Sequence, residues 1–417
     1  MIKRFAQCLR EYKWTALVSP VCMIGEVAME VTIPLVMADL YDYGIAMSNM
    51  AVVWQKALQL LLCALASLLF GCLSADYASK AATGFARNLR HDMYYRVQDF
   101  SFSNIDKFSS ASIVTRLTSD VATIQMAFQM MIRMAIRCPM MLILATVSSL
   151  RISPKLSTVY FIAIPLLALV LLGIIPLVFR IFDRVFKTYD RLNTVVQENV
   201  HGIRVVKSFV REDKEVSKFE AISKAIYDIL AVNAPAMQIC VYSCILVISW
   251  VGAKMVVASG NNAALGLTTG ELSSMFTYTT QILSSLMMLS IVFVMVTMAQ
   301  APLRRCYEIL TEKPDLTSPE NAVRDVPDGS IDFENVSFRY SQKAKRPALQ
   351  DVDLHIPSGS TVGILGATGS SKSTLVQLIP RLYDATEGSV RVGGIDVKDY
   401  DLEVLRDNVA MVLQKNT

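Results

Sequence analysis

The 417-residue chain is rich in apolar side chains, which make up 53% of its sequence, whereas charged residues make up only 18%. This composition excludes a disordered protein, which would combine low hydrophobicity with high charge. It also disfavours an ordinary soluble enzyme, in which roughly a quarter of all residues are charged. The net charge of +4 is too small to indicate nucleic-acid binding. The composition therefore predicts a polytopic membrane protein with a water-exposed part.

The eight cysteines lie mostly in or beside apolar runs and form no CxxC pair. Because disulfide frameworks belong to small secreted domains, we interpret these cysteines as packing residues in a reducing compartment. The three histidines are scattered, so no structural metal site is expected. We also expect no cleavable signal peptide, since no small-residue cleavage pattern closes a short apolar core at the N-terminus.

Six segments have the length and apolar character of membrane-spanning helices, which need about 20 residues. They cover residues 14–38, 52–75, 126–150, 156–179, 236–258 and 273–299. Lysine and arginine are abundant in the long connections 76–125 and 180–235, and absent from the short connections 39–51 and 259–272. The positive-inside rule therefore places the N-terminus and both long connections in the cytoplasm.

The two long connections are expected to extend the spanning helices beyond the membrane. Apolar residues recur at helical spacing around Ile113 and around Val200, with short breaks at 109–112 and at Gly202. The connections are either solvated helical hairpins or helices whose tips dock on another domain.

Charged side chains also occur within or beside the predicted spans. Glu26 and Glu30 lie one turn apart in the first span. They predict either a site for a cationic substrate or a proton, or a polar contact with another span. Arg133 and Arg137 are expected to extend to the cytoplasmic surface.

After residue 300 the sequence changes to a linker rich in acidic and turn-forming residues, followed by short β-type runs. We predict strands at 331–338, 348–356, 361–365, 389–392 and 409–413, and a helix at 373–382. Strands that alternate with a helix indicate an α/β domain.

The segment 361–374 carries the clearest functional motif, because an apolar run enters a glycine-containing turn and Lys-Ser-Thr then begins the predicted helix. This is the context of the phosphate-binding loop G-x-x-x-x-G-K-[ST], where backbone N–H groups and a helix N-terminus bind the anion. Lys372 is expected to reach the β- and γ-phosphates, and Ser373 to bind Mg²⁺. The predicted binding residues of the loop are Gly366, Thr368, Gly369, Ser370, Ser371, Lys372 and Ser373.

Ser371 stands where the motif has its second glycine. A side chain there either crowds the phosphate or strains a backbone suited to glycine. A left-handed conformation alone costs about 1–2 kcal/mol, or roughly a five- to thirtyfold loss of affinity. The alternative is a serine-rich strand–turn–helix that binds no ligand.

Over essentially its whole length the chain resembles the ATP-binding-cassette exporters of the half-transporter type. Residues 108–121 and 196–212 resemble the two intracellular loops of that family, and the run 331–340 resembles the start of its nucleotide-binding domain. The resemblance implies an all-α six-helix transmembrane domain with long intracellular helices over residues 1–300, a linker over 301–330, and the first part of an α/β nucleotide-binding domain over 331–417. It also implies that Tyr340 stacks on adenine, that Thr374 contacts phosphate, and that Gln414 contacts Mg²⁺ in a Q-loop.

The resemblance further implies ATP and Mg²⁺ as cofactors and a second half-transporter as partner, in a homo- or heterodimer within the lipid bilayer. Closure of the two nucleotide-binding domains around ATP would pass through the tips at 104–112 and 201–209 to the spans. The spans would then export an amphipathic small molecule, lipid or peptide across the plasma membrane, with the nucleotide-binding part in the cytoplasm. Nucleic acid is not an expected partner.

The chain ends three residues after Gln414, before the positions at which the family carries its signature loop, Walker B carboxylates and switch histidine. On this ground we expect no autonomous ATP hydrolysis and low stability of the last ~90 residues. We also expect an exposed apolar strand at 361–365. Two alternative functions are a non-hydrolysing, nucleotide-sensing regulatory subunit and an inert remnant.

Overall fold

The computed structural model describes residues 1–154, 233–261, 266–340 and 346–412, together with isolated helical positions between 157 and 224. The chain divides into two compact units. Unit 1 contains Met1–Cys8, Phe85–Gln125 and Ala299–Thr417, and unit 2 contains Leu9–Gly84 and Met126–Met298. The predicted fourth span, the second intracellular tip and Gln414 lie outside the described residues.

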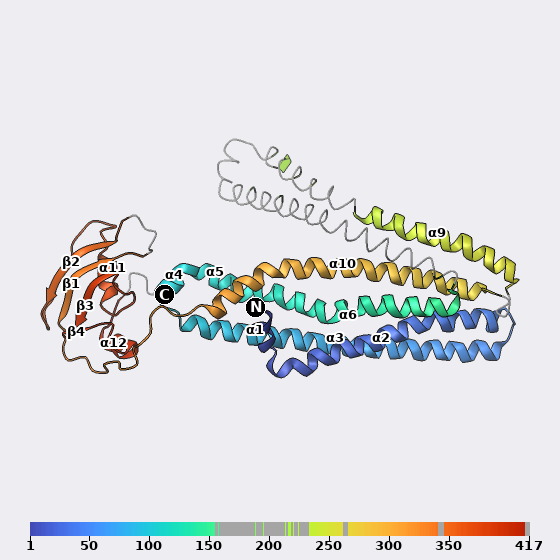
Figure 1. The fold of residues 1–417 in the computed structure, drawn as a ribbon, viewed down its shortest axis with the longest axis horizontal. Coiled ribbons are helices and arrows are strands. Elements are labelled where there is room, and N and C mark those ends of the chain that lie inside the picture. Colours follow the sequence, from blue (N-terminus) through green and yellow to red (C-terminus); the bar gives the residue numbers. More distant parts are fainter. Residues whose placement is uncertain are drawn as a thin grey trace. The chain divides into compact units, whose positions relative to one another are not determined.

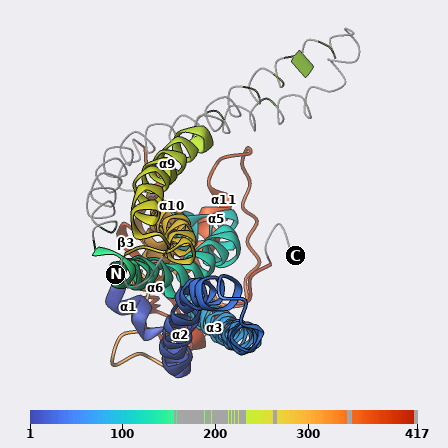
Figure 2. The same cartoon turned by 90° about the vertical axis from the view of Figure 1, so that its right-hand side faces the viewer.

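Four helical stretches of the described chain are long and apolar enough to cross a membrane, namely Arg10–Ile45, Met50–Gln98, Ser110–Ile152 and Thr269–Thr311. Their main helices are α2 (Lys13–Asp39), α3 (Met50–Gln98), α6 (Val121–Ile152) and α10 (Thr269–Thr311), which run side by side in Figures 1 and 2. These four helices coincide with the predicted first, second, third and sixth spans. The predicted fifth span coincides with α9 (Asn233–Ser259).

Unit 2 is held together by an apolar core to which α2, α6 and α10 contribute. Met23, Val27 and Val31 recur every fourth residue on α2 and face the same cluster. Hydroxyl groups of α10 add polar contacts: Tyr278 Oη donates to the Val31 carbonyl at 2.7 Å, and Ser274 Oγ donates to the Pro34 carbonyl at 2.6 Å. α2 and α10 are therefore joined both by burial of apolar surface and by buried hydrogen bonds.

The segment of unit 1 between α3 and α6 contains α4 (Phe102–Phe108), α5 (Ser110–Thr115) and the π-helical turn η3 (Arg116–Asp120), which leads into α6. The predicted break at 109–112 is confirmed at Ser109, whose φ of 60° ends α4 and whose hydroxyl accepts the Ser112 N–H to begin α5. Three short helices remain: α1 (Ile2–Gln7) and η1 (Arg10–Tyr12) near the N-terminus, and η2 (Leu40–Ile45) between α2 and α3.

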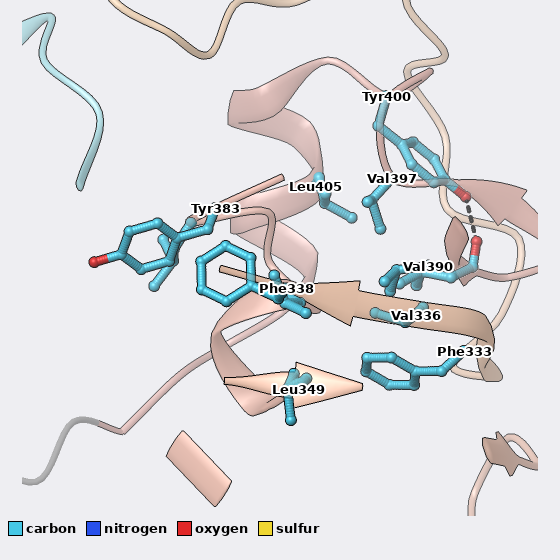
Figure 3. Packing of buried hydrophobic residues seen from close by; sticks show 12 residues of the cluster. Phe333, Val336, Phe338, Leu349, Tyr383, Val390, Val397, Tyr400 and Leu405 are labelled. Carbon is cyan, nitrogen blue, oxygen red and sulfur yellow. Dashed lines mark hydrogen bonds between the residues drawn. The ribbon is translucent and has the colours of Figure 1, made fainter. Parts of the chain in front are cut away.

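The C-terminal part of unit 1 is a four-stranded sheet with two short helices. The strands β1 (Ile331–Phe338), β2 (Leu349–Ile356), β3 (Glu387–Val392) and β4 (Ile395–Asp396) pair in the order β2-β1-β3-β4. The helices are α11 (Lys372–Leu378) and α12 (Leu402–Asn408). An irregularity in β1, where Asn335 has a φ of 49°, keeps Phe333 and Val336 in one core despite their odd spacing (Figure 3).

Several expected details of this sheet are wrong. The described parts of 361–365 and 409–413, both predicted as strands, form no strand, whereas the four named strands pair antiparallel. Within the described residues no strand lies beside 361–365 to pair with this apolar run, and Leu365 is 96% exposed. α11 ends at Leu378 instead of 382, because the chain turns there through Arg381, whose φ is 50°. α10 continues to Thr311, inside the range predicted as linker.

Candidate functional site

The loop between β2 and α11 is an exposed turn whose backbone favours glycine at one position. Gly369 has a φ of 85°, a left-handed conformation that costs other residues free energy. A Cβ atom on Gly366 would lie 2.6 Å from Ser370 Oγ, so that the Ser370 hydroxyl would have to rotate away. The predicted positions Gly366, Thr368, Gly369 and Ser370 therefore lie together on one tightly turned segment.

Ser371 adopts the left-handed conformation that its place in the motif predicts. Its φ and ψ are 60° and 24°, and it immediately precedes the first residue of α11. Its side chain makes no capping hydrogen bond to the helix, so the structure offers no compensation for the backbone strain. A glycine at this position would adopt the same backbone without that cost.

Lys372 begins α11 and folds back over the loop. Its ammonium group donates to the carbonyl oxygens of Gly366 and Ala367, both at 2.9 Å, and to Ser370 Oγ at 3.3 Å. These three acceptors surround the ammonium group in the way that phosphate oxygens could. The lysine therefore closes the loop on itself, and an arriving polyphosphate would exchange with those acceptors.

Tyr340, two residues after the end of β1, lies against α11. Its hydroxyl shares a hydrogen bond with Thr374 Oγ1 at 2.9 Å and donates to Gln377 Oε1 at 3.4 Å. Thr374 is buried, whereas Tyr340 remains 53% exposed, so much of its ring is open to solvent. The structure thus joins two residues that the sequence assigned separately to a base and to a phosphate.

The residues of this site fit a nucleoside polyphosphate. The turn supplies glycine backbone, Lys372 supplies a positive charge, and the first N–H groups of α11 have no carbonyl partner within the helix. Ser373 is exposed on the first turn, where its hydroxyl could bind a cation. Within the described residues no group of three or more His, Cys, Asp or Glu could hold a metal.

Sequence analysis missed Tyr383, which connects this site to helix α4. The Tyr383 hydroxyl donates to Asp106 Oδ2 of α4 at 2.6 Å, and Phe102 of α4 packs on the same domain core. Burial, and then the hydrogen bond to Asp106, raise the pKa of Tyr383. The only signal in the sequence was the expectation that the tip at 104–112 docks on another domain.

α4 also holds the chain that follows α10. Asn104 is fully buried; its side-chain amide donates to the Lys313 carbonyl at 3.2 Å, and its oxygen accepts the Asp315 N–H at 3.3 Å. The same side chain forms a capping box with Ser101 at the start of α4. One asparagine therefore stabilises a helix end and fixes the segment leading to the sheet.

The charged residues of the first span form a polar contact with another helix in unit 2. Arg137 of α6 donates to Glu26 and, at 2.6 Å, to Glu30, both on α2. This contact favours the inter-helix interpretation of the two glutamates. The two carboxylates, one turn apart, offer the guanidinium two acceptors. The extension of Arg137 to the cytoplasmic surface stays a prediction.

Two family models match the chain: the ABC transporter transmembrane region over residues 16–287, and the ABC transporter model over residues 349–417. Among relatives, the "Uncharacterized ABC transporter ATP-binding protein YfiB" of Bacillus subtilis is 31% identical, over 98% of this chain and 71% of its own length. The "Uncharacterized ABC transporter ATP-binding protein Rv1273c" of Mycobacterium tuberculosis is 28% identical over the same shares. The chain therefore belongs to the ABC transporter family, as a half-transporter of the exporter type in which a transmembrane domain is fused to a nucleotide-binding domain.

Proposed function

We propose that the chain is one subunit of an ATP-driven exporter that moves an amphipathic small molecule, lipid or peptide across the plasma membrane by alternating access. The observation that carries this proposal is the joint placement of Lys372, Tyr340 and Thr374 around one loop. The proposed domains are residues 1–300, with six spans, a linker over 301–330, and a nucleotide-binding part from 331 onwards in the cytoplasm.

In this proposal each residue of the loop has a separate role. Lys372 exchanges its loop carbonyls for β- and γ-phosphate oxygens, Ser373 orients the cation, and Thr374 positions a phosphate. Tyr340 offers its ring to the base. Gly366, Thr368, Gly369, Ser370 and Ser371 contribute backbone around the phosphates, and Gln414 contacts Mg²⁺. Bound Mg-ATP supplies the free energy that favours one arrangement of the spans over the other.

The proposal also includes a second half-transporter, since two nucleotide-binding domains enclose ATP in this family. Hydrolysis of ATP is then a property of the assembled dimer. The basic connections on one side of the membrane support the cytoplasmic location of the loop.

Nucleotide binding tests the proposal directly. Isothermal titration of Mg-ATP into the purified full chain should give saturable heat, and Lys372→Ala should weaken the affinity at least about tenfold, because a charge-assisted contact is removed. Lys398→Ala changes an exposed lysine of the same domain and is the matched control. Equal affinities for the wild type and Lys372→Ala, or no heat in either, would reject the proposal.

A further inference from the structure

Tyr383 lies between the nucleotide site and α4 and contacts both. Its hydroxyl donates to Asp106 Oδ2 at 2.6 Å, and its ring centroid is 6.1 Å from that of Phe102, so two side chains of α4 touch it. On the other side its ring meets Tyr340 edge-on, with centroids 5.3 Å apart and planes at 86°. Figure 3 shows the Tyr383 ring against Phe338 with its hydroxyl directed away from the core.

The contact with Asp106 is a strong one for a surface helix. The acceptor is a carboxylate, and such charge-assisted bonds are shorter and stronger than neutral ones. The raised pKa of Tyr383 keeps its phenol protonated at neutral pH, so the donor is present. The ring itself is 8% exposed and packs in the core of the sheet domain, which limits its movement.

In this conformation hydrogen bonds of its hydroxyl hold the Tyr340 side chain to α11. Its hydroxyl is shared between Thr374 and Gln377, and its ring orientation is set by edge contacts with Phe338 and Tyr383. Under the proposed function, on which this step depends, a base stacks on Tyr340 and a phosphate reaches Thr374. Both events compete with the hydrogen bonds that the Tyr340 hydroxyl makes to α11, and both change the edge contact between the rings of Tyr340 and Tyr383.

We propose that Tyr383 is a positioning residue that transmits the state of the nucleotide site from Tyr340 to α4 through its hydrogen bond with Asp106. The ring of Tyr383 responds to the ring of Tyr340, and the hydroxyl passes that response to Asp106. A ligand shifts α4 by this route because Tyr340 makes different contacts in the free and nucleotide-bound states. The hydroxyl is needed for the transmission and not for nucleotide binding.

The matched control is Tyr400, a second buried tyrosine of the same domain. Its hydroxyl donates to the Val392 carbonyl at 2.8 Å, within the core of the sheet domain (Figure 3). Tyr383→Phe and Tyr400→Phe each remove one hydroxyl and retain the ring. Only Tyr383→Phe removes a bond to α4, so a general loss of domain stability affects both variants and a loss of transmission affects one.

Amide hydrogen exchange in the full-length dimer in lipid nanodiscs, with and without Mg-ATP, tests this role. In the wild type, Mg-ATP should change exchange in the loop 366–374 and in α4. In Tyr383→Phe the change in the loop should persist with nucleotide affinity within about twofold, while the change in α4 falls at least about fivefold. Tyr400→Phe should behave as the wild type does in both segments.

Three results would overturn the role of Tyr383. These are an unchanged α4 response in Tyr383→Phe, an equal loss in Tyr400→Phe, or a wild-type α4 that does not respond while the loop does. Failure of the proposed function is recognised separately, because then the loop itself does not respond to Mg-ATP in the wild type.

Discussion

Arg305 of α10 forms a bidentate ion pair with the carboxylate of Asp120 in η3. Its Nε donates to one carboxylate oxygen at 2.7 Å and its Nη2 to the other at 2.5 Å. The Arg305 carbonyl in turn accepts a hydrogen bond from Arg116 Nη1 at 2.7 Å, and Arg116 also pairs with Glu308 at 3.0 Å. The end of α10 and the turn that leads into α6 are thus joined by reciprocal contacts of two arginines.

Removing Arg305 should destabilise this junction. The Asp120 side chain is only 5% exposed, so Arg305→Ala leaves a buried carboxylate without its bidentate partner. Because Arg305 itself is 44% exposed, solvent reduces the cost, and we expect a loss of about 2 kcal/mol in the free energy of unfolding. Arg304→Ala, which breaks an exposed pair with Glu308, should cost about 0–1 kcal/mol. Denaturant titrations in detergent that give equal losses would contradict this expectation.

Replacing Ser371 with glycine should strengthen nucleotide binding. The residue has a φ of 60° and no capping bond, so glycine removes strain without removing a contact. We expect about 1 kcal/mol, or roughly a fivefold gain in Mg-ATP affinity, measured by calorimetry. Gly369→Ala, at a φ of 85°, introduces the same strain and should act in the opposite direction. A gain from both changes would refute the backbone explanation.

Asn104→Ala should release the segment after α10 from α4. The change removes half of a capping box and two contacts with 313–315, and leaves buried backbone groups without partners. We expect a loss of about 2 kcal/mol in stability and faster proteolysis in the range 312–330. Ser103→Ala, which loses an exposed bond to Asp315 and a bond shared with the Ser101 hydroxyl but leaves Asn104 in place, should change proteolysis less. Equal cleavage rates in the two variants would contradict the role of Asn104.

The contribution of Tyr383 to stability should depend on pH. Its pKa is raised above the usual tyrosine value of 10.0, first by burial and then by Asp106. A raised folded-state pKa gives stability that is fully present below the unfolded value and is lost as pH rises above it. The wild type should therefore keep a constant advantage over Tyr383→Phe from about pH 7 to pH 9 and lose it above about pH 10. A difference in the free energy of unfolding between the two proteins that stays constant from pH 7 to above about pH 10 would contradict the contribution of the Tyr383 hydroxyl.

Arg137→Gln should be costly in unit 2, because it leaves Glu26 and Glu30 one turn apart without a cation. We expect a loss of about 3 kcal/mol in the free energy of unfolding in detergent. Glu30→Gln removes the excess negative charge of the cluster and should cost about 1 kcal/mol or less. The double variant Glu30→Gln with Arg137→Gln should recover part of the loss, and no recovery would argue against charge as the cause.

The sequence was most informative where a local pattern is sufficient. Apolar length alone located α2, α3, α6, α9 and α10, because a helix satisfies its own backbone in lipid. The motif around Lys372 located the loop, and the serine at 371 predicted its strained backbone, since the left-handed region penalises any Cβ atom. The break at Ser109 followed from a run of small residues that cap a helix.

Strand pairing could be predicted less well from the sequence, because it depends on which other strands lie beside a segment. The apolar run at 361–365 has every local feature of a strand and forms none, while β1 contains an irregularity at Asn335 that alternation alone would not allow.

Composition, apolar length and one lysine-containing motif were enough to establish a membrane protein with a phosphate loop, because each is a property of consecutive residues. The pairing of Tyr383 with Asp106, 277 positions apart, and of Arg305 with Asp120, 185 positions apart, was decided by the tertiary structure alone. Each of these four side chains is unremarkable in its own segment. Their roles arise only where folding brings a donor within hydrogen-bonding distance of a distant carboxylate, and no local periodicity encodes that distance.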